Sequence, residues 1–538
     1  MSMITATTWV PRGFAAPFPQ KYVFDEDEFD RIQQLARLQL DDAKEDLDEA
    51  KKGEKSKDDG NNEVTGDVVN KIKDDIEIDD DLKEYDLEHY DDDDHAVDKD
   101  GEPLAIFGNI KSLVYHENND EDPYITMPDN LDEDVEREDL QILESDNLVL
   151  AARIEDEMAH LEVYVYEDEA DNLYVHHDIM LPAIPLALEW LNTPVGKGPI
   201  DETSRGNFVA VGTMDPDIEL WDLDIVDGMY PNAILGQGAE DAANPDKKKK
   251  KKKRSKKAND EFHVDAVLSL AHNRFHRNLL ASSSADKTIK LWDLSTTKCA
   301  KSYSYHTDKV CSLAWHPTET TALLSGSYDR TVVAADMRAP EAKAPRWGVE
   351  SDVEQVKWDP HDPNFFYIST ENGVIHYHDA RLAPSSPAQT KPIWTLQAHD
   401  ESISSFDINP IIPGYIATGS TDKEVKLWNV QSNGPSMIAS RNLGVGKVFS
   451  TTFAPDREVG FRLAVAGSKG SVQVWDTSTN AAVRRAFTDR VAPVANESEV
   501  KERLVGVDES NGESDSEEGE EDEDGASDGP DGWESMEE

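Results

Sequence analysis

Cysteine is scarce in this sequence. Among 538 residues only Cys299 and Cys311 carry thiols, which is too few for a disulfide framework in a chain of this length. Such sparing use of cysteine is typical of proteins in a reducing compartment, such as the cytosol or the nucleus. We therefore expect both thiols to be small, unpaired residues of a core.

Long hydrophobic runs are missing as well. No stretch approaches eighteen consecutive apolar residues, and the first twenty residues have neither a basic start nor an apolar signal core. We expect a soluble intracellular protein that is neither secreted nor embedded in a membrane.

The motifs of common catalytic sites are also missing. The sequence has no phosphate-cradling glycine loop, no zinc-type cysteine pairs, no His-Glu-x-x-His and no nucleophile elbow. His176 and His177 lie in an apolar, strand-like run that favours a place in the core or at the surface over a metal site. His376 and His378 could share one strand face, but no third ligand follows at a useful spacing. We predict no enzymatic activity, no catalytic or metal-binding residues, no cofactor and no small-molecule substrate.

Positive charge is outnumbered by negative charge. The chain has 54 Lys and Arg against 111 Asp and Glu, a net charge of −57. The acid gathers at 73–95, at 117–140 and in the last 31 residues, which hold 16 Asp or Glu and no Lys or Arg. Like-charged blocks with few aliphatic residues do not bury enough surface to fold, so we expect disorder there. These blocks keep the protein in solution, contact basic proteins or repel nucleic acid.

The acidic tail also holds candidate phosphorylation sites. Ser510, Ser514 and Ser535 each have an acidic residue three positions downstream. Acid-directed kinases prefer this context, and phosphate groups would deepen the negative charge.

Repeated strand patterns fill the middle of the chain. Each unit has a short apolar or β-branched run, a turn of Gly, Ser or Asp, and a second alternating run that ends in Asp or Asn. The second runs end at Asp222, Asp293, Asp336, Asp379, Asn429 and Asp476, with a looser match at Glu167. A further strand precedes most units, at 184–192, 266–272, 309–317, 352–360, 402–410 and 447–455. One four-stranded blade does not bury both of its faces alone, whereas a closed ring of blades does. Seven units therefore predict an all-β, seven-bladed propeller.

Four residue types recur at fixed places in these units: a His before the first strand, a Ser or Thr on the second, an Asp in the turn and a Trp on the third. This pattern resembles the WD-repeat family, in which the four side chains form a hydrogen-bonded tetrad. Two units have the full set, namely His263, Ser282, Asp286 and Trp292, and His399, Thr418, Asp422 and Trp428. The unit at His306 keeps Ser325 and Asp329 but has Ala335 in place of Trp, and the last unit keeps Trp475 without the His or the turn Asp. We expect the incomplete blades to be less rigid.

The N-terminal segment has a different pattern. Apolar residues recur at helical steps after Asp25 and predict an amphipathic helix over about 25–50. The apolar residues before it have nothing local to pack against. Either the segment folds back on the propeller, or it docks a partner through apolar residues of the arm and helix. The candidate docking residues are Trp9, Pro11, Phe14, Phe29 and Ile32.

Segments outside the repeats carry a closer resemblance. Residues 7–14, 31–47, 79–93, 107–126 and 146–167 together resemble the periodic tryptophan protein 1 family of eukaryotic WD-repeat proteins, and the likeness runs from residue 4 to about residue 480. The resemblance implies a non-enzymatic scaffold of the nucleus and nucleolus that acts in early assembly of the large ribosomal subunit and in pre-rRNA processing. Implied partners are pre-60S assembly factors and ribosomal proteins, with pre-rRNA as a further candidate.

The predicted organisation has three parts. Residues 1–105 form an N-terminal extension, with the short helix at about 25–50 and acidic disorder at about 51–100. Residues 106–490 form the propeller, with an acidic insertion at about 117–140 and a lysine-rich loop at about 228–261. Residues 491–538 form an acidic disordered tail.

Two other functions stay open. Asp336 to Arg338 and Asp379 to Arg381 are Asp-x-Arg sequences at the ends of successive units. They partly resemble the WDxR box of propeller substrate receptors of ubiquitin ligases, although both lack its Trp. The acidic segments favour histones as partners, and with them a regulator of rRNA gene transcription in chromatin.

A basic run interrupts the propeller. Ten of the eleven residues from 247 to 257 are basic, namely Lys247, Lys248, Lys249, Lys250, Lys251, Lys252, Lys253, Arg254, Lys256 and Lys257. Both flanks belong to the same propeller, so the run is a long loop and no domain linker. An exposed basic cluster of this kind predicts a nuclear or nucleolar import signal. Contact with ribosomal RNA, through release of counterions, is a second candidate role.

Overall fold

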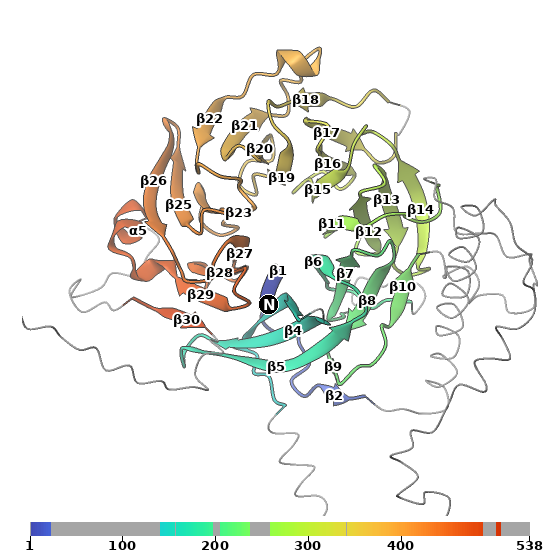
Figure 1. The fold of residues 1–538 in the computed structure, drawn as a ribbon, viewed down its shortest axis with the longest axis vertical. Helices are drawn as coiled ribbons and strands as arrows, with labels where there is room; N and C mark the ends of the chain where they lie inside the picture. Colours follow the sequence, from blue (N-terminus) through green and yellow to red (C-terminus); the bar gives the residue numbers. More distant parts are fainter. Residues whose placement is uncertain are drawn as a thin grey trace, which may run out of the picture.

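The computed structural model describes residues 2–22, 140–156, 158–196, 205–236, 259–339, 342–487 and 502–506. Within these residues, seven four-stranded sheets stand around a central axis as the blades of a propeller (Figure 1). The prediction of an all-β, seven-bladed propeller is confirmed. No helix in the described part of the chain is long and apolar enough to cross a membrane.

We number the blades one to seven around the ring and give their strands from the inside outwards. Blade one contains β1 (Ser2–Val10), β3 (Asn147–Glu155), β4 (Met158–Glu167) and β5 (Asn172–Leu181). Blade two contains β6 (Pro185–Leu191), β7 (Phe208–Thr213), β8 (Ile218–Asp222) and β10 (Ala233–Leu235). Blade three contains β11 (Val267–His272), β12 (Leu279–Ser284), β13 (Ile289–Asp293) and β14 (Lys298–Tyr303). Blade four contains β15 (Val310–Trp315), β16 (Ala322–Ser327), β17 (Thr331–Asp336) and β18 (Arg346–Gly348).

The other blades follow the same order. Blade five contains β19 (Val353–Trp358), β20 (Phe365–Thr370), β21 (Val374–Asp379) and β22 (Trp394–Gln397). Blade six contains β23 (Ser405–Ile408), β24 (Tyr415–Gly419), β25 (Val425–Gln431) and β26 (Gly434–Arg441). Blade seven contains β27 (Val448–Phe453), β28 (Arg462–Gly467), β29 (Val472–Asp476) and β30 (Leu504–Gly506). Short 3-10 helices lie at η5 (Pro387–Gln389) and η6 (Thr477–Thr479), and one helical turn and a half forms α5 (Ala481–Ala486).

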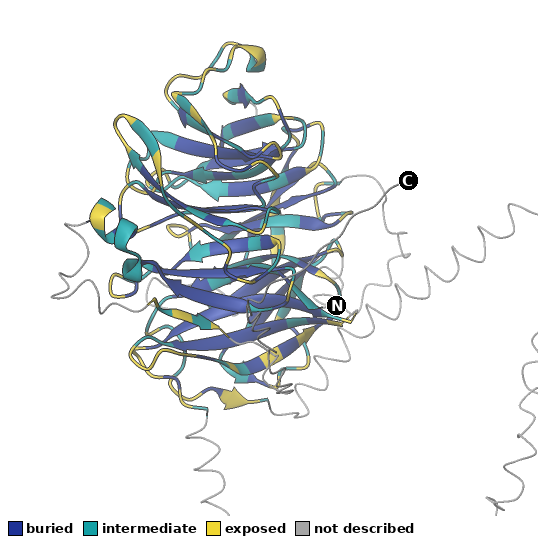
Figure 2. Ribbon diagram, turned by 60° about the vertical axis from the view of Figure 1, so that its left-hand side comes forward, coloured by how far each residue is buried: buried dark blue, intermediate teal, exposed yellow. Residues whose placement is uncertain are grey.

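The middle strands are buried on both faces because neighbouring blades cover both. Every residue of β7 and β28 is buried, whereas the outer strand β14 is exposed over half of its length. Figure 2 shows this gradient as dark blue strands inside the stack and lighter edges and turns. The β-branched and apolar runs of the sequence fit these positions because both pleated faces meet another sheet.

In the turn after the second strand, one residue adopts the left-handed backbone conformation. Lys287, Arg330 and Lys423 have φ values of 71°, 63° and 72° in this position in blades three, four and six. An Asp precedes each of them, and its carboxylate accepts hydrogen bonds from the turn, as Asp286 Oδ1 does from Thr288 N at 2.9 Å. These short polar bonds hold a backbone conformation that non-glycine residues otherwise avoid.

The N-terminus is part of the ring, contrary to the predicted boundary. β1 pairs antiparallel with β3 and is the innermost strand of blade one, drawn in blue at the centre of Figure 1. Farther on, β2 (Gln20–Lys21) pairs in parallel with β9 (Ile225–Val226) of blade two. The prediction that residues 1–105 form an extension outside the propeller is therefore wrong for residues 2–22. Residues 23–139 are an insertion between the first and second strands of blade one.

Two other predicted boundaries also need correction. The outer strand of blade seven, β30, lies at residues 504–506, inside the segment predicted as a tail from residue 491. Strand β10 lies inside the predicted lysine-rich loop at 228–261, where it completes blade two by pairing with β8. In both cases a strand of three residues is too short to leave a periodic pattern in the sequence.

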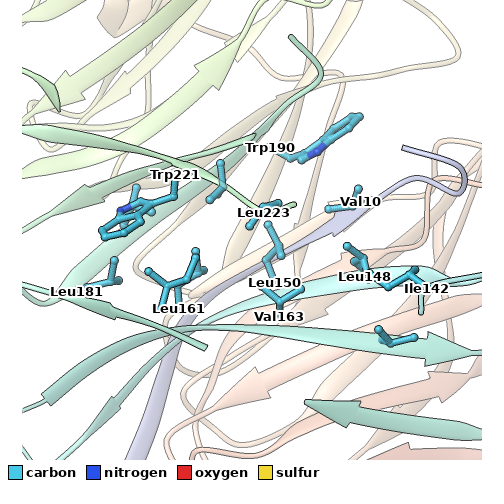
Figure 3. Close-up of a cluster of buried hydrophobic side chains, with 14 of the residues drawn as sticks. Val10, Ile142, Leu148, Leu150, Leu161, Val163, Leu181, Trp190, Trp221 and Leu223 are labelled. Atoms are coloured by element: carbon cyan, nitrogen blue, oxygen red, sulfur yellow. The ribbon is translucent and has the colours of Figure 1, made fainter. Parts of the chain in front are cut away.

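The core consists of apolar clusters between neighbouring blades. Figure 3 shows the cluster between blades one and two, in which Val10 of β1 meets Leu148 and Leu150 of β3 and Trp190 of β6. Ile142, just before β3, joins the same cluster. A strand from the N-terminus is thus built into the core of a blade whose other strands begin at residue 147.

Cys299 and Cys311 are free thiols on blades three and four, in agreement with the expectation of unpaired cysteines. Both are partly buried against apolar clusters. Burial raises the pKa of each thiol, with a larger effect at Cys311.

Several predicted features lie outside the described residues. They are the helix at about 25–50 with Phe29 and Ile32, the acidic segments at 51–100 and 117–139, Lys247 to Lys257, and Ser510, Ser514 and Ser535. They stay predictions.

Candidate functional site

The tetrad of blade three forms a buried hydrogen-bond chain. Trp292 Nε1 donates to Ser282 Oγ at 2.7 Å, and His263 Nε2 lies 2.7 Å from the same hydroxyl. His263 Nδ1 lies 2.9 Å from Asp286 Oδ2. Burial lowers the pKa of His263. At Asp286 burial opposes ionisation, but hydrogen bonds from His263 and Thr288 outweigh it and lower the pKa to about 2. These hydrogen bonds connect the loop before the blade, which holds His263, to the turn with Asp286 and to the third strand with Trp292.

Blade six repeats this arrangement. Trp428 Nε1 donates to Thr418 Oγ1 at 3.0 Å, His399 Nε2 lies 2.8 Å from that hydroxyl, and His399 Nδ1 lies 2.7 Å from Asp422 Oδ2. Burial also lowers the pKa of His399. The four side chains of this tetrad have a structural role, because their polar groups form hydrogen bonds with one another.

The incomplete tetrads differ in how much they retain. In blade four, His306 Nε2 lies 2.8 Å from Ser325 Oγ and His306 Nδ1 lies 3.2 Å from Asp329 Oδ2, so the set forms without an indole. In blade seven, Trp475 is fully buried and its Nε1 has no hydrogen-bond partner among the described residues. Blade seven thus keeps the apolar part of the motif and loses the polar part.

Blade two substitutes an acid for the hydroxyl. Trp221 Nε1 donates to Glu219 Oε2 at 3.1 Å. Burial raises the pKa of Glu219 to about 7; the bond from Trp221 lowers it, while Asp217 and Asp215 add to the increase. Sequence reasoning missed this residue, although its place two positions before the Trp is visible in the repeat.

Replacing Glu219 with Gln is expected to stabilise the protein at alkaline pH. The folded pKa lies above the unfolded value near 4.5, so the native carboxyl binds a proton that the unfolded chain releases. Stability is therefore lost as pH rises from about 4.5 to 7, and Gln avoids this loss while keeping an acceptor for Trp221. We expect E219Q to gain about 1–3 kcal/mol over the native chain between pH 5 and pH 8. Urea denaturation of both proteins at pH 5 and at pH 8 measures this difference in the free energy of unfolding.

The exposed Glu319 supplies the control for this experiment. E319Q should leave the pH dependence of unfolding unchanged. Equal pH profiles for E219Q and the native chain would show that the Glu219 carboxyl is ionised in the folded state.

The seam between blades seven and one closes the ring. Thr7 N donates to Ser450 Oγ at 3.1 Å, and the hydroxyls of these two residues lie 2.8 Å apart. Trp9 Nε1 donates to Thr452 O at 3.0 Å. Arg12 extends the seam by donating its backbone amide to Asp456 Oδ2 at 3.1 Å. These bonds join residues more than four hundred positions apart in the chain.

The same contacts recur between consecutive blades. Trp315 Nε1 donates to Ala271 O at 2.9 Å, and Trp358 Nε1 donates to Ala314 O at 3.2 Å. Trp9 therefore holds the place of the inner-strand Trp of blades four and five. A signal for this was present in the sequence, because Trp9 is followed after one residue by Pro, as are Trp315 and Trp358.

Charged residues hold the outer part of the seam. Arg462 Nε donates to Asp168 Oδ1 at 2.8 Å, and Arg462 Nη1 lies 2.7 Å from Asp476 Oδ1. Tyr166 donates its hydroxyl to Asp168 at 3.0 Å, and Arg503 beside β30 also contacts Asp168. A buried guanidinium between two carboxylates is fully paired, so it can fix how blade one sits on blade seven.

Three of the five predicted docking residues, Trp9, Pro11 and Phe14, lie among the described residues. Trp9 is 6% exposed and Phe14 packs edge-on against Trp190 with ring centroids 4.8 Å apart. Pro11 is partly buried. The first of the two interpretations, a segment that folds back on the propeller, holds for these residues, and the docking role assigned to Trp9 and Phe14 is wrong. Trp9 is buried because it lies on β1 within the ring, and Phe14 follows β1 and packs, partly buried, against the cluster between blades one and two.

The histidine pairs form no metal centre. Among the described residues no cluster of His, Cys, Asp and Glu has the geometry to hold an ion. His376 and His378 stack with ring centroids 6.1 Å apart, and His378 is 1% exposed. Burial lowers the pKa of His378 to about 4 and that of His177 to about 4. His177 and His378 are therefore neutral, buried side chains over the physiological range.

The two Asp-x-Arg sequences lie at the surface. Arg338 is 73% exposed and its Nη2 lies 2.8 Å from Asp336 Oδ2; Arg381 is 61% exposed and lies 2.7 Å from Asp379 Oδ2. Each guanidinium thus pairs with the carboxylate of its own box.

Comparison with known proteins agrees with this geometry. The protein-family model described as WD domain, G-beta repeat matches residues 257–293, 297–333 and 390–429. These are the regions of blades three, four and six, which have the His, Ser or Thr and Asp contacts. Beyond single repeats, the chain is 50% identical over 517 residues to an uncharacterised WD repeat-containing protein of Schizosaccharomyces pombe, with 96% of each chain covered.

Two further relatives also match over most of their length. Periodic tryptophan protein 1 of Saccharomyces cerevisiae is 39% identical over 548 residues, covering 94% of this chain and 93% of the relative. The periodic tryptophan protein 1 homolog of Drosophila melanogaster is 32% identical over 493 residues, covering 90% of this chain and 96% of the relative. The similarity therefore includes the segments outside the repeats.

Proposed function

Because the chain belongs to the periodic tryptophan protein 1 family of WD-repeat scaffolds, we propose that it serves ribosome biogenesis, in early nucleolar assembly of the large subunit and in pre-rRNA processing. The likeness to that family over nine-tenths of the chain is the observation that supports this role most. The histidines of blades three, four and six are engaged in tetrads, and His177 and His378 are buried in the core, which supports a structural role for these side chains.

The ring is suited to hold several proteins together. Its seven blades present loops on both faces, and the inserted segments at 23–139 and 237–258 leave from blades one and two. In this proposal the partners are pre-60S assembly factors and ribosomal proteins, with pre-rRNA as a further ligand. The net charge of −57 repels phosphate, so RNA contact would require a local basic segment such as 247–257.

Depleting the protein tests the proposed function directly. We expect precursors of the large-subunit rRNAs to accumulate while the small-subunit rRNA matures normally. A tagged chain should co-purify with large-subunit pre-rRNA and ribosomal proteins. Unchanged pre-rRNA processing after complete depletion would overturn the proposal.

The lysine run should direct the protein to the nucleus and nucleolus. Replacing Lys247 to Lys253 with Ser removes seven positive charges, so recognition by an import receptor should fail. We expect the tagged variant to stay in the cytoplasm, as seen by fluorescence microscopy.

Replacing the same seven residues with Arg keeps the charge and provides the matched control. This variant should remain nuclear. A serine variant that still enters the nucleolus would assign import to another segment or to a carrier protein.

A receptor role in a ubiquitin ligase is the second candidate, and the exposure of Arg338 and Arg381 is the observation that favours it. R338A/R381A should then lose binding of the ligase adaptor without losing ribosomal partners. Recovery of histones in the same purification would instead support the chromatin role.

A further inference from the structure

Three exposed lysines lie on one face of blades six and seven. We call it the upper face, which is the face with the turn between the second and third strands of each blade. Lys423 lies in that turn of blade six, and Lys469 lies in that turn of blade seven. Lys447 lies in the loop that joins β26 to β27 (Figure 1). We call these three residues the lysine trio.

Backbone hydrogen bonds connect the three positions. Lys469 N donates to Val445 O at 3.1 Å, so the turn of blade seven packs on the loop that holds Lys447. The amide that follows Lys447 donates to Ser420 O at 3.2 Å, and Lys423 N donates to the same carbonyl oxygen at 3.2 Å. The lysine trio therefore belongs to one connected surface at the junction of blades six and seven.

The positive charges of the lysine trio are not paired within the described part of the chain. None of the three ammonium groups makes a hydrogen bond or an ion pair with a described residue. The carboxylates in and beside the turn of blade six have other partners, namely Asp422 with His399 at 2.7 Å, Glu424 with Lys426 at 3.6 Å and Glu401 with Thr421 at 2.7 Å. The lysine trio is thus a patch of unpaired positive charge in a chain with a net charge of −57.

The acidic tail leaves the fold on the same side of blade seven. Strand β30 runs antiparallel to β29, and its last residue, Gly506, pairs with Gln473 near the start of β29. Because β29 starts at the upper-face turn, the chain leaves β30 toward the upper face. Gln473 and Lys469 are four residues apart, so their Cα atoms are separated by at most about 14 Å. The first carboxylates of the tail, at positions 508 and 509, follow Gly506 by two and three residues.

Other charged segments of the chain fit this surface less well. The insertion at 23–139 joins β1 and β3 at the ends where Val10 pairs with Leu148, which lie on the face opposite the upper turn of blade one. Its acidic segments therefore leave the ring away from the lysine trio. The lysine run at 247–257 is a second basic partner open to the tail, but it precedes blade three, three blades away around the ring.

We propose that residues 508–524 of this chain bind in cis to the lysine trio and shield it from other polyanions. This segment has eleven Asp or Glu among seventeen residues and no Lys or Arg, so its charge is complementary to that of the lysines. Attachment to the same chain gives the segment a high effective concentration at the lysines, so weak single contacts are enough for binding. This goes beyond the proposed assembly role and does not depend on which particle the protein joins.

The proposed contact also gives the predicted phosphorylation sites a physical effect. Ser510 and Ser514 lie inside the segment at 508–524. Each phosphate group would add up to about two negative charges next to the lysines and so strengthen the contact. Phosphorylation would therefore favour the shielded state.

Cross-linking of the full chain with a carbodiimide tests the contact, because this reagent joins only carboxylates and amines that touch. We expect peptides from 508–524 linked to Lys423, Lys447 or Lys469, as identified by mass spectrometry. The yield should fall at high salt because screening weakens the attraction. Lys309 is the matched control, since it is exposed and directly precedes β15 of blade four as Lys447 directly precedes β27. Equal linking at Lys309 would overturn the proposal.

The shielding is measured by the binding of a polyanion. Fluorescence anisotropy with a labelled oligouridylate should show about fivefold tighter binding after deletion of residues 507–538, because the lysine trio then becomes open to phosphate groups. This deletion keeps β30, so the thermal melt should match that of the native chain. Adding K423S/K447S/K469S to the truncated chain should return the affinity to that of the native chain.

K298S/K301S/K309S is the control with the same change in charge, because it removes three exposed lysines from blades three and four. In the truncated chain this control should leave the gain in affinity in place. The proposal is wrong if both triple variants lower the affinity equally, or if deletion of the tail leaves the affinity unchanged. It is also wrong if the tail cross-links to residues 247–257 and not to the lysine trio. Links only between two chains, seen in a mixture of isotope-labelled and unlabelled protein, would contradict binding in cis.

Discussion

A chain that lacks residues 2–10 will not form a closed propeller. β1 makes eight paired positions with β3 and buries Ile4 and Val10 completely, with Trp9 6% exposed. Its loss uncovers the inner edge of β3 and empties the seam against β27 of blade seven. We expect the free energy of unfolding to fall by roughly 10 kcal/mol, which is comparable with the whole stability of a folded domain. Circular dichroism and size-exclusion chromatography will show loss of the native state.

Deletion of the segment inserted between β1 and β3 is the control for deletion of residues 2–10. Ile142 N donates to Pro17 O at 3.0 Å, so the chain leaves and re-enters the ring at one place. Replacing residues 24–138 with a short Gly-Ser linker should leave the melting transition of the propeller in place. Native-like melting of the chain without residues 2–10 would show that the ring closes without β1.

Trp292→Ala should give the largest effect of any single substitution in the tetrads. Trp292 is 1% exposed, packs in the cluster between blades two and three, and donates to Ser282 Oγ at 2.7 Å. Truncation leaves a cavity between blades and removes a hydrogen bond. We expect a loss of about 3–5 kcal/mol, as for other buried Trp side chains, measured by urea denaturation.

Trp292→Phe separates packing from hydrogen bonding. Phe keeps much of the apolar contact but does not donate to Ser282, so the loss should be about 1–2 kcal/mol. L382A, at a side chain that is 72% exposed on blade five, serves as the surface control and should melt as the native chain does. A W292A chain with unchanged stability would contradict the structural role of the tetrad.

The repeats could be predicted because each is a local pattern. Second and third strands such as β12 and β13 follow each other within fifteen residues, and the turn between them has an Asp that fixes its backbone. Apolar alternation, turn residues and the His, Ser or Thr, Asp and Trp positions therefore lie in one short window of the sequence. Blade count and blade order followed from these windows.

The first strand could not be found in the same way because its partners are remote. β1 pairs with residues 147–155, after an insertion of more than a hundred residues, and its seam partners lie near residue 450. The Trp9 and Pro11 spacing repeats that of blades four and five, yet this pattern is short and stands alone at the N-terminus. Apolar residues with no local partner left two interpretations open, a segment folded back on the propeller and an arm for another protein. In the structure Trp9 contacts the last blade and Phe14 packs against Trp190 of blade two.

The tetrads were predicted residue by residue because their spacing is fixed by the blade.

Cross-linking of Thr7 to Ser450 tests ring closure by the N-terminal strand most directly. Their hydroxyl oxygens lie 2.8 Å apart, close enough for cysteines at these two positions to form a disulfide after oxidation. In T7C/S450C we expect a disulfide between positions 7 and 450, which keeps the N-terminal peptide attached after cleavage within residues 23–139. T7C/S405C, with its second cysteine on the inner strand of blade six, should remain unlinked. Absence of the link in folded T7C/S450C, or equal linking in both variants, would contradict closure of the propeller by β1.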